Sequence, residues 1–263
     1  MPPGDHYARS GPRWRLGAEL VYRPIAAALV ATSPHPLTGR IVLDAGAGTG
    51  AATPALSRRR ARIVAMDLSH AMLAWHAATR PPCAVADIRT LPLPACAVDD
   101  CVAAFVLNHL TDPEAGLAEL ARVTRPGGAV LATVFGNDSH SDARDRIDAA
   151  AEAAGWQVPT WYRELKSVAA PLLGTARGMA AAARGAGLAE VRTQERHVDV
   201  GVTEARQLVR YRLGHPAFAA WLDAIGPRAT TAFAEVAKRA VGDPMEPYRP
   251  SVVFLRAVTS GRR

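Results

Sequence analysis

The sequence predicts an α/β protein with a mostly parallel sheet, helices on both faces and a helical cap. Short apolar runs alternate with segments of helical periodicity, a glycine-rich turn follows the first apolar run, and aspartates end three successive runs. Alternating strands and helices imply right-handed crossovers and a parallel sheet covered on both sides. With 263 residues, 49% of them hydrophobic, the chain is long enough for one full core and an appended cap.

The elements follow from local patterns read in chain order. Ile41-Val42-Leu43 is a short apolar run typical of a buried strand, and a sharp turn with three glycines follows it. Ser69 is an N-cap candidate and Pro113 suits a first helical turn. The expected helices are 51–60, 69–78 and 113–124, and the expected later strands are 61–67, 83–87, 100–107, one within 125–135, and 251–258. A further helix and strand that continue the core are expected within 178–200.

Aspartates stand where three of these strands end: Asp44, Asp67 and Asp87. Open α/β sheets bind ligands at the carboxyl ends of their strands, and carboxylates hydrogen-bond strongly to ribose hydroxyls. The glycines at 46–50 are spaced G-x-G-x-G, one residue tighter than the dinucleotide motif, and Asp44 would repel a pyrophosphate. The pattern favours a nucleoside that lacks phosphates and has a cationic, amino acid end.

Four segments in this order resemble class I S-adenosylmethionine (SAM)-dependent methyltransferases: VLDAGAGTG, VAMDLSHAML, ADIRTLPLP and FVLNHLTDPEAGLAELARVTRPGGAVLATVF. The resemblance covers about residues 18–136. It is strongest to the small-molecule group that includes quinone C-methyltransferases and natural-product methyltransferases. It implies a Rossmann-like, seven-stranded sheet, SAM as the cofactor and a methyl transfer to an O, N or C atom of a small molecule, in specialised metabolism by analogy.

The resemblance also implies where SAM is held. The methionine end is expected on Asp44, Gly46 and Gly48, and the ribose on Asp67. The adenine ring is expected among Leu68, Met72, Asp87 and Ile88, and the wall under the sulfonium at Phe105 and Val106. An N-terminal segment with His6 and Tyr7 resembles the family's lid, and Tyr22 is a further candidate for reaching the cofactor.

His109, in LNHLTD just after the fourth strand, is the expected catalytic residue. Its loop should face the methyl group, and an imidazole with an unperturbed pKa near 6.5 could accept a proton from an incoming hydroxyl. Methyl transfer to an ionised or carbon-centred acceptor would run on alignment alone and leave His109 as loop support.

No metal site is expected, because Cys83, Cys96 and Cys101 match no zinc spacing and are best interpreted as buried small hydrophobes. The first fifteen residues contain no apolar signal region, and no apolar run approaches the roughly 20 residues of a membrane span. A cytoplasmic protein with no membrane or nucleic-acid partner is therefore expected. The net charge of +7 is mostly arginine, and its densest run, 58–62, is interpreted as a solvated helix end.

The expected organisation is one structural domain. Residues 1–136 form the lid and SAM-binding core, 137–172 a cap insertion, and 173–263 the rest of the core with a second insertion at about 201–247. The insertions carry most of the tryptophans, which is typical of an apolar small-molecule pocket. Arg206 and Arg210, four residues apart, are interpreted as a solvated helix face.

Three other functions stay open at this stage. A nucleic-acid base methyltransferase should resemble its family by an Asn/Asp-Pro-Pro-Tyr motif after the fourth strand, where this chain has VLNHL. A SAM-binding enzyme that catalyses another step, such as a cyclisation, is not excluded by any residue, and a non-catalytic SAM-binding domain is disfavoured by the intact motifs. Formation of S-adenosylhomocysteine separates methyl transfer from the last two.

Overall fold

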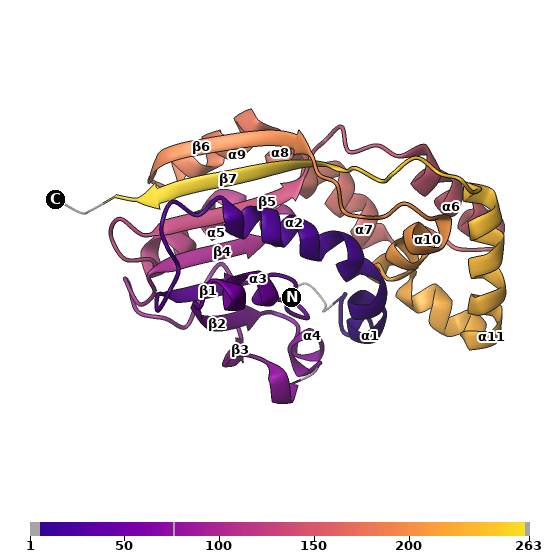
Figure 1. Cartoon of the computed structure of the whole chain (residues 1–263), viewed down its shortest axis with the longest axis horizontal. Helices are drawn as coiled ribbons and strands as arrows, with labels where there is room; N and C mark the ends of the chain where they lie inside the picture. The colour runs from indigo at the N-terminus through magenta and orange to yellow at the C-terminus, as the bar shows by residue number, and fades with distance from the viewer. Residues whose placement is uncertain (1–5, 76, 261–263) are drawn as a thin grey trace.

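The computed structural model describes residues 6–75 and 77–260, and a seven-stranded sheet forms one half of the molecule (Figure 1). The strand order is β3-β2-β1-β4-β5-β7-β6, and only β7 runs antiparallel to its neighbours. The strands are β1 Ile41–Ala45, β2 Arg62–Asp67, β3 Cys83–Val85, β4 Asp100–Ala104, β5 Ala129–Phe135, β6 Leu188–His197 and β7 Ser251–Thr259. The predicted seven-stranded, mostly parallel fold is confirmed.

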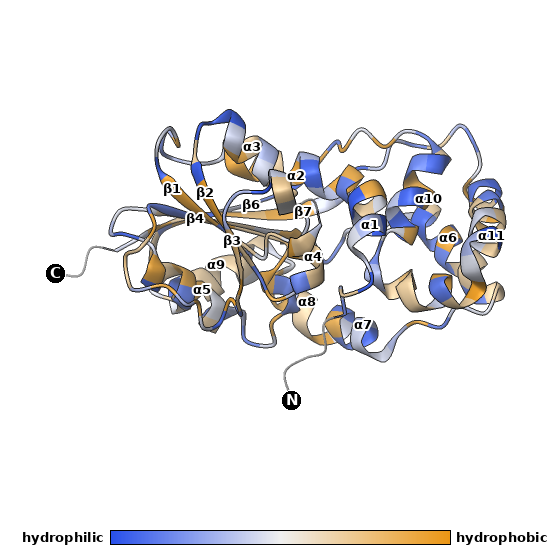
Figure 2. Cartoon of the chain, turned by 90° about the horizontal axis from the view of Figure 1, so that it is seen from below, coloured by the Kyte–Doolittle hydropathy of each residue, from blue (hydrophilic) through white to orange (hydrophobic). Residues whose placement is uncertain are grey.

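Helices cover both faces of this sheet (Figure 2). One face carries α2 (Glu19–Ala31) and α3 (Thr53–Arg58), and the other carries α5 (Pro113–Val123), α8 (Ala170–Leu173) and α9 (Ala176–Gly185). The strands β1, β4, β5 and β7 are almost entirely buried, as expected where a sheet is covered on both sides. Among the predicted caps, the Ser69 hydroxyl accepts from the Met72 amide, where α4 (His70–Ala74) begins.

The other half of the molecule is a helical cap at the carboxyl ends of the parallel strands (Figure 1). It contains α6 (Asp142–Ala153) and α7 (Thr160–Glu164), which follow β5, and α10 (Ala205–Leu213) and α11 (Pro216–Val241), which lie between β6 and β7. The π-helical turn at Trp14–Ala18, which follows the short N-terminal helix α1 (Gly11–Arg13), packs against α10. Buried residues of the cap and of the sheet belong to the same hydrophobic cluster.

The chain order of the strands reverses between β1 and β4, which are neighbours in the sheet. After β1 the chain goes on to β2 and β3 on one side, and β4 and β5 lie on the other. Such a reversal leaves a crevice at the carboxyl ends of the two central strands, which is the usual ligand site of open α/β sheets. The glycine turn and the turn at Phe105 both open into this crevice.

Several predicted elements end at other residues than expected. The helix predicted at 69–78 ends at Ala74, because Trp75 is extended and the Arg80 guanidinium takes the last carbonyls, Met72 O and Leu73 O; position 76 lies outside the described residues. The strand predicted at 83–87 is the three-residue edge strand β3, and all its residues are exposed. Cys83, on this strand, is therefore exposed. Cys96, in the segment before β4, is exposed too, and only Cys101 is buried as expected.

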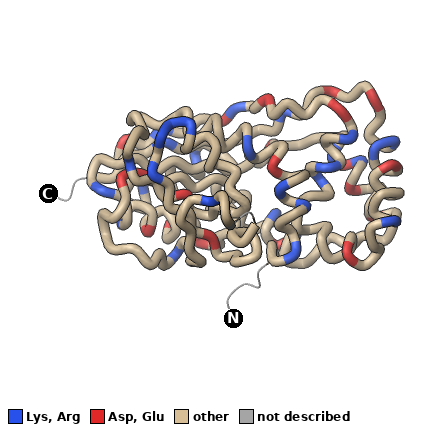
Figure 3. Tube along the Cα trace, turned by 60° about the horizontal axis from the view of Figure 1, so that its bottom comes forward, with Lys and Arg blue, Asp and Glu red and all other residues tan. Residues whose placement is uncertain are grey.

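Charge is spread rather than gathered on one face. Lys and Arg positions occur in both halves of the molecule, with Asp and Glu positions among them (Figure 3). Within residues 6–75 and 77–260, no helix has the length and apolar character to cross a membrane.

Candidate functional site

The glycine turn after β1 is shaped by close packing against the turn after β4. Gly46 has φ +69°, and a Cβ there would lie 2.4 Å from the Val106 Cβ, so only glycine fits. Gly48 has φ +52°, but a Cβ there would meet only Met72 Cε at 3.5 Å, an ordinary contact. The Gly48 amide donates to Asp67 Oδ2 at 2.7 Å. The turn thus presents bare backbone beside two carboxylates.

Asp44 is a buried carboxylate without a protein partner for one of its oxygens. It is 1% exposed, and Oδ2 makes no hydrogen bond within the described part of the chain. Burial raises its pKa to about 7, an effect that Arg80 opposes and Asp67 reinforces. An orphaned buried acceptor costs free energy, so this side chain is suited to a cationic, hydrogen-bond-donating ligand group.

Asp67 ends β2 and is held in a fixed orientation. Its Oδ1 accepts from the Ser69 amide at 2.8 Å while Oδ2 accepts from Gly48. The side chain is half-buried, and a carboxylate oxygen can accept more than one hydrogen bond. Next to it, Leu68 is 46% exposed and Met72 is buried under the turn. An exposed leucine beside the ribose-binding candidate provides an apolar surface of the kind that an adenine ring would cover.

Asp87 lies two residues beyond β3 and is already engaged. The Arg89 guanidinium donates to both its oxygens, Nε to Oδ1 at 3.0 Å and Nη2 to Oδ2, and the bond to this side chain lowers the Asp87 pKa. Ile88 is buried beside it, 7% exposed. The adenine role predicted for Asp87 therefore requires its carboxylate to accept one more donor while it stays paired with Arg89.

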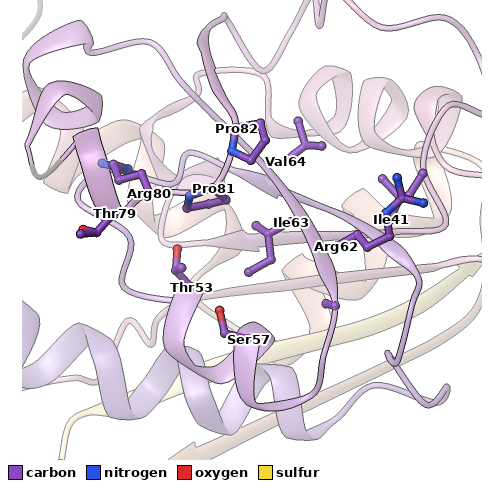
Figure 4. A pocket seen from close by; sticks show the side chains of 11 residues that line it. Ile41, Thr53, Ser57, Arg62, Ile63, Val64, Thr79, Arg80, Pro81 and Pro82 are labelled. Carbon is purple, nitrogen blue, oxygen red and sulfur yellow. The ribbon is translucent and has the colours of Figure 1, made fainter.

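Arg80 is a residue that sequence reasoning missed. Its Nη1 donates to Gly48 O at 2.8 Å and to Met72 O at 2.9 Å, so the guanidinium ties the glycine turn to α4. Arg80 also lines a separate cavity of about 510 Å³ between α3 and β2, together with Thr53 and Ser57 (Figure 4). That cavity does not include the strand-end aspartates, so it is not the cofactor site.

A second side-chain contact connects α2 to the glycine turn. The Thr49 hydroxyl donates to the buried Glu19 carboxylate, which also pairs with Arg15 and Arg23. Glu19 is 3% exposed and lies at the start of α2. No motif in the sequence pointed to Glu19 or Thr49, because their contact joins residues 30 positions apart.

The turn after β4 is strained. Phe105 has φ +60°, a left-handed conformation that is rare for an aromatic residue, while its amide continues the sheet by donating to Thr133 O at 2.8 Å. Its ring packs edge-on against Tyr22 at 4.7 Å and against Phe135 at 4.6 Å between centroids. Strain of this kind is found at sites where function fixes the backbone. Tyr22, predicted near the cofactor, thus lies against Phe105.

His109 follows this turn and contacts the N-terminal segment. The Tyr7 hydroxyl and His109 Nε2 lie 3.1 Å apart, and His6 stacks on Trp161 of α7 at 4.4 Å between ring centroids. Residues 6 and 7 therefore link the sheet edge to the cap, as a lid would. The expectation of an ordinary histidine pKa was wrong: burial first, then His6 and Lys166, lower the His109 pKa to about 4.

A cavity of about 380 Å³ opens beside His109, between the sheet edge and the cap. Its size falls within the range of small-molecule sites. Phe105 and His109 line it, whereas Asp44, Asp67 and Asp87 do not. Residues from the lid, the strand ends and the cap form its wall, namely Tyr7, Trp14, Tyr22, Phe105, Asn108, His109, Phe135, Gly136, Asn137, Ser139, His140, Arg144, Tyr162, Leu165, Lys166, Ala170, Pro171, Tyr211, Arg212 and His215.

Most of the cap residues in this wall were not singled out from the sequence. Arg144, Lys166 and Arg212 reach one cavity only because α6, the turn after α7 and α10 pack together. Arg206 and Arg210 do not line it: Arg206 pairs with Glu204, and Arg210 donates to Leu16 O at 2.9 Å. Both are exposed, in agreement with their interpretation as a solvated face.

Part of the chain is similar to known methyltransferases. Residues 43–132 match the family model described as a methyltransferase domain. A demethylmenaquinone methyltransferase of Mycolicibacterium paratuberculosis is 36% identical over 126 residues, which cover 48% of this chain and 53% of that protein. A malonyl-[acyl-carrier protein] O-methyltransferase of Serratia marcescens is 38% identical over 115 residues, covering 43% of this chain and 44% of that protein. The match thus spans about half the length of these relatives.

A solved structure extends the fold match over nearly the whole chain. Haemonchus contortus phosphoethanolamine N-methyltransferase 2, in complex with S-adenosyl-L-methionine, superposes with a TM-score of 0.60 at 18% identity and covers 97% of this chain and 57% of that one. At this identity the likeness shows the fold alone. Together with the match to a methyltransferase domain, it confirms the predicted methyltransferase fold.

Proposed function

We propose that this chain, whose residues 43–132 match a methyltransferase domain, is a class I SAM-dependent methyltransferase that transfers a methyl group from SAM to an O, N or C atom of a small molecule. The observation that carries the proposal is the pair of sites on either side of Phe105. On one side lie the glycine turn and the orphaned Asp44 carboxylate, and on the other lies the 380 Å³ cavity. A reaction between a bound nucleoside and a small acceptor needs such an arrangement.

The residues at the crevice suit the cofactor group by group. Asp44 offers a buried acceptor to the ammonium of the methionine end, and Gly46 leaves room for that end against the backbone. Asp67, fixed by two backbone amides, accepts from the ribose hydroxyls. Leu68 and Met72 border the adenine, with Ile88 and the Arg89-paired Asp87 at its edge. Phe105 and Val106 form the wall under the sulfonium.

When bound, SAM supplies an electrophilic methyl group on a sulfonium that is already a good leaving group. The protein then needs chiefly to align the acceptor and to exclude water, which contributes many orders of magnitude in rate to bimolecular reactions. The aromatic rings of Tyr22, Phe105 and Phe135 pack closely at the junction of the two sites and limit how an acceptor lies.

His109 and Tyr7 are the polar pair at this junction. With a pKa of about 4, the imidazole is neutral at physiological pH, so one nitrogen is always available to accept a hydrogen bond from the acceptor or from Tyr7. We propose that His109 orients the acceptor and takes its proton where the acceptor is a hydroxyl. His109→Ala should reduce turnover about 10² to 10⁴-fold and change SAM affinity only a few-fold. Equal turnover at saturating SAM would reduce His109 to loop support.

Incubation with methyl-labelled SAM tests the function itself. The panel of acceptors is phenols, quinones, amines and isoprenoids, and the readout is acceptor-dependent formation of S-adenosylhomocysteine with label in the acceptor. Asp67→Ala should weaken SAM binding in calorimetry by about 1.5 to 3 kcal/mol, the loss expected for hydrogen bonds to a charged group. Unchanged SAM affinity in a folded Asp67→Ala variant would contradict the cofactor assignment.

SAM binding without S-adenosylhomocysteine formation would favour the alternatives, a non-methylating SAM-dependent step such as a cyclisation or a binding domain. Label in nucleic acid would point to a base methyltransferase, which the absence of an Asn/Asp-Pro-Pro-Tyr motif after the fourth strand disfavours. The role in specialised metabolism is part of the proposal and rests on the identity of the acceptor.

A further inference from the structure

The cavity beside His109 has more positive than negative charge in its wall. Arg144, Lys166 and Arg212 all line it, from three different parts of the cap. Arg212 is 5% exposed and is neutralised by Asp148, with both hydrogen bonds at 2.6 Å. It is a structural cation, held between Asp148 and the Tyr162 and Phe218 rings.

Arg144 and Lys166 have no such counterion. Within residues 6–75 and 77–260, no carboxylate lies within ion-pair distance of either side chain. The Arg144 guanidinium donates to one backbone carbonyl, Ser139 O, at 3.1 Å. Asp142 and Asp145 contact His140, another residue of the cavity wall, but their side chains are 78% and 50% exposed and are screened by solvent.

The pKa values of three residues in the cavity wall are shifted by this positive charge. The Tyr162 pKa is lowered although burial raises it, because Arg212 and Lys166 stabilise the phenolate. Burial and then Arg212, Lys166, His109 and Arg144 lower the His215 pKa. The Lys166 pKa is lowered too, by desolvation and by the two arginines, although the residue as a whole is exposed. The potential in the cavity is positive.

Two polar atoms in the wall are buried and lack partners in the described part of the chain: Ser139 Oγ and Asn108 Oδ1. The Ser139 hydroxyl belongs to the residue whose carbonyl holds Arg144, so it adds a neutral donor beside that guanidinium. Asn108 adjoins His109 and adds an acceptor to the wall. The wall therefore combines cationic and neutral donors, an acceptor and the aromatic rings of Tyr22, Phe105 and Tyr211.

We infer that the acceptor is an acidic small molecule, with an apolar or aromatic body, whose oxyanion is held by Arg144, Lys166 and the Ser139 hydroxyl while its nucleophilic group faces Asn108 and His109. This inference rests on the proposed function and names the substrate class of that same site. Carboxylate and phosphate share the required chemistry, and both accept charge-assisted hydrogen bonds from guanidinium and ammonium groups.

Calorimetry with matched acid and amide probes tests the inference without turnover. The probes are 4-hydroxybenzoate, 4-hydroxyphenylacetate and 3-(4-hydroxyphenyl)propanoate, each beside its primary amide, with 4-hydroxyphenyl phosphate as the phosphate arm, all with S-adenosylhomocysteine present. At least one acid should bind tenfold or more tightly than its amide, and the difference should shrink with added NaCl. Tighter binding of the phosphate than of every carboxylate would assign the oxyanion as phosphate.

Variants then locate the oxyanion. Arg144→Gln and Lys166→Met should each weaken the best acid about tenfold and leave its amide unchanged, while Arg144→Lys should retain most of the affinity. Arg146→Gln is the matched control: it lies on the same helix, contacts Val241 O and does not line the cavity. Circular dichroism checks that each variant is folded.

Equal binding of every acid and its amide, including no measurable binding of either, would overturn the inference, as would equal losses for acid and amide in the variants. The outcome is separable from the proposed function. Acid-selective binding without S-adenosylhomocysteine formation would uphold the anion site and reject the methyl transfer. Methyl transfer confined to neutral acceptors would do the reverse.

Discussion

At the scale of single residues, the cofactor crevice contains two aspartates in opposite states. Asp67 is half-buried and accepts from two backbone amides, whereas Asp44 is fully buried with one oxygen unpartnered. Hydrogen bonds from amides favour the ionised carboxylate, and burial disfavours it. The two residues are therefore expected to respond differently to pH and to ligand.

We expect Asp44 to make SAM binding pH-dependent. Burial raises its pKa to about 7, and the ammonium of the ligand prefers the ionised form, so binding below pH 7 must first displace a proton. SAM affinity measured by calorimetry should fall about tenfold from pH 8 to pH 6 relative to Asp44→Asn, which carries no titrating group and shares any titration of the ligand. The same slope in both proteins would contradict this role of Asp44.

The raised pKa of Asp44 also affects the stability of the folded protein. Between the unfolded value near 4 and the folded value of about 7, the folded protein binds more protons at Asp44 than the unfolded chain. The Asp44 contribution therefore stabilises the fold as the pH falls through 7 and reaches its full size below about 4. His109 acts in the opposite sense, because its folded pKa of about 4 lies below the unfolded value, so its contribution is lost as the pH falls from about 6.5 to 4.

Gly46 is predicted to be less replaceable than other glycines with positive φ. Gly39 has φ +76° and open space where a Cβ would be, whereas a Cβ at Gly46 would meet the Val106 side chain at 2.4 Å. Gly39→Ala should lower the free energy of unfolding by about 1 kcal/mol from the backbone conformation alone. Gly46→Ala adds a steric conflict and should cost about 3 kcal/mol. Urea unfolding measures both, and equal losses would mean that Val106 moves aside freely.

At the scale of elements, the cap is tied together by the ion pair between α6 and α10. Asp148 and Arg212 come from helices on the two separate cap segments, and Arg212 is 5% exposed. Arg212 also donates to the Tyr162 hydroxyl at 3.4 Å. Because a buried cation without a counterion is costly, this pair fixes how the two segments meet and thereby where the cavity wall lies.

Removal of the Asp148 carboxylate should show how much this ion pair stabilises the fold. Asp148→Ala leaves Arg212 buried and unpaired, and we expect a loss of about 3 kcal/mol in the free energy of unfolding, reduced where solvent reaches the 25% exposed Asp148 side chain. Glu235→Ala is the control, since its pair with Lys238 is on the surface and should be worth less than about 0.5 kcal/mol. Similar effects of the two substitutions in urea unfolding would argue that Arg212 relaxes into solvent.

At the scale of the whole molecule, the cap shares one of the two hydrophobic clusters in the described part of the chain with the sheet half. Trp156 and Phe218 of the cap, whose rings stack at 4.1 Å, belong to the same buried cluster as Leu56 and Leu131 of the sheet half. A continuous core couples the unfolding of its parts. The cap is therefore expected to unfold together with the sheet, and the single structural domain stays a prediction.

Calorimetric unfolding tests that coupling. The protein should melt in one transition, and SAM at about 100 times its Kd should add about 2.7 kcal/mol and shift the whole transition upward. Near-ultraviolet circular dichroism, which follows the cap tryptophans, should give the same midpoint as the far-ultraviolet signal. Two separate transitions, with only one shifted by SAM, would show that the cap is an independent unit.

The sequence by itself determined the alternation of strands and helices, the glycine turn and the aspartates at the strand ends. These features depend on local patterns: a buried strand is apolar, a positive φ favours glycine, and Asp44 and Asp67 fall at strand ends wherever the strands pair. Predictions were wrong where the feature depends on contacts between residues that are not neighbours in the sequence. The end of α4 depends on Arg80, eight residues beyond Met72, and the exposure of Cys83 depends on β3 being an uncovered edge.

Only the tertiary structure decided which residues face the acceptor. Arg144, Lys166 and Arg212 are spread over almost 70 positions and carry no motif, and they line one cavity because α6 and α10 pack around a shared ion pair. The pKa of His109 likewise depends on burial and on Lys166, which local sequence does not encode. Strand ends are fixed by the chain near them, whereas the electrostatics of a cavity are the sum of groups that only packing brings together.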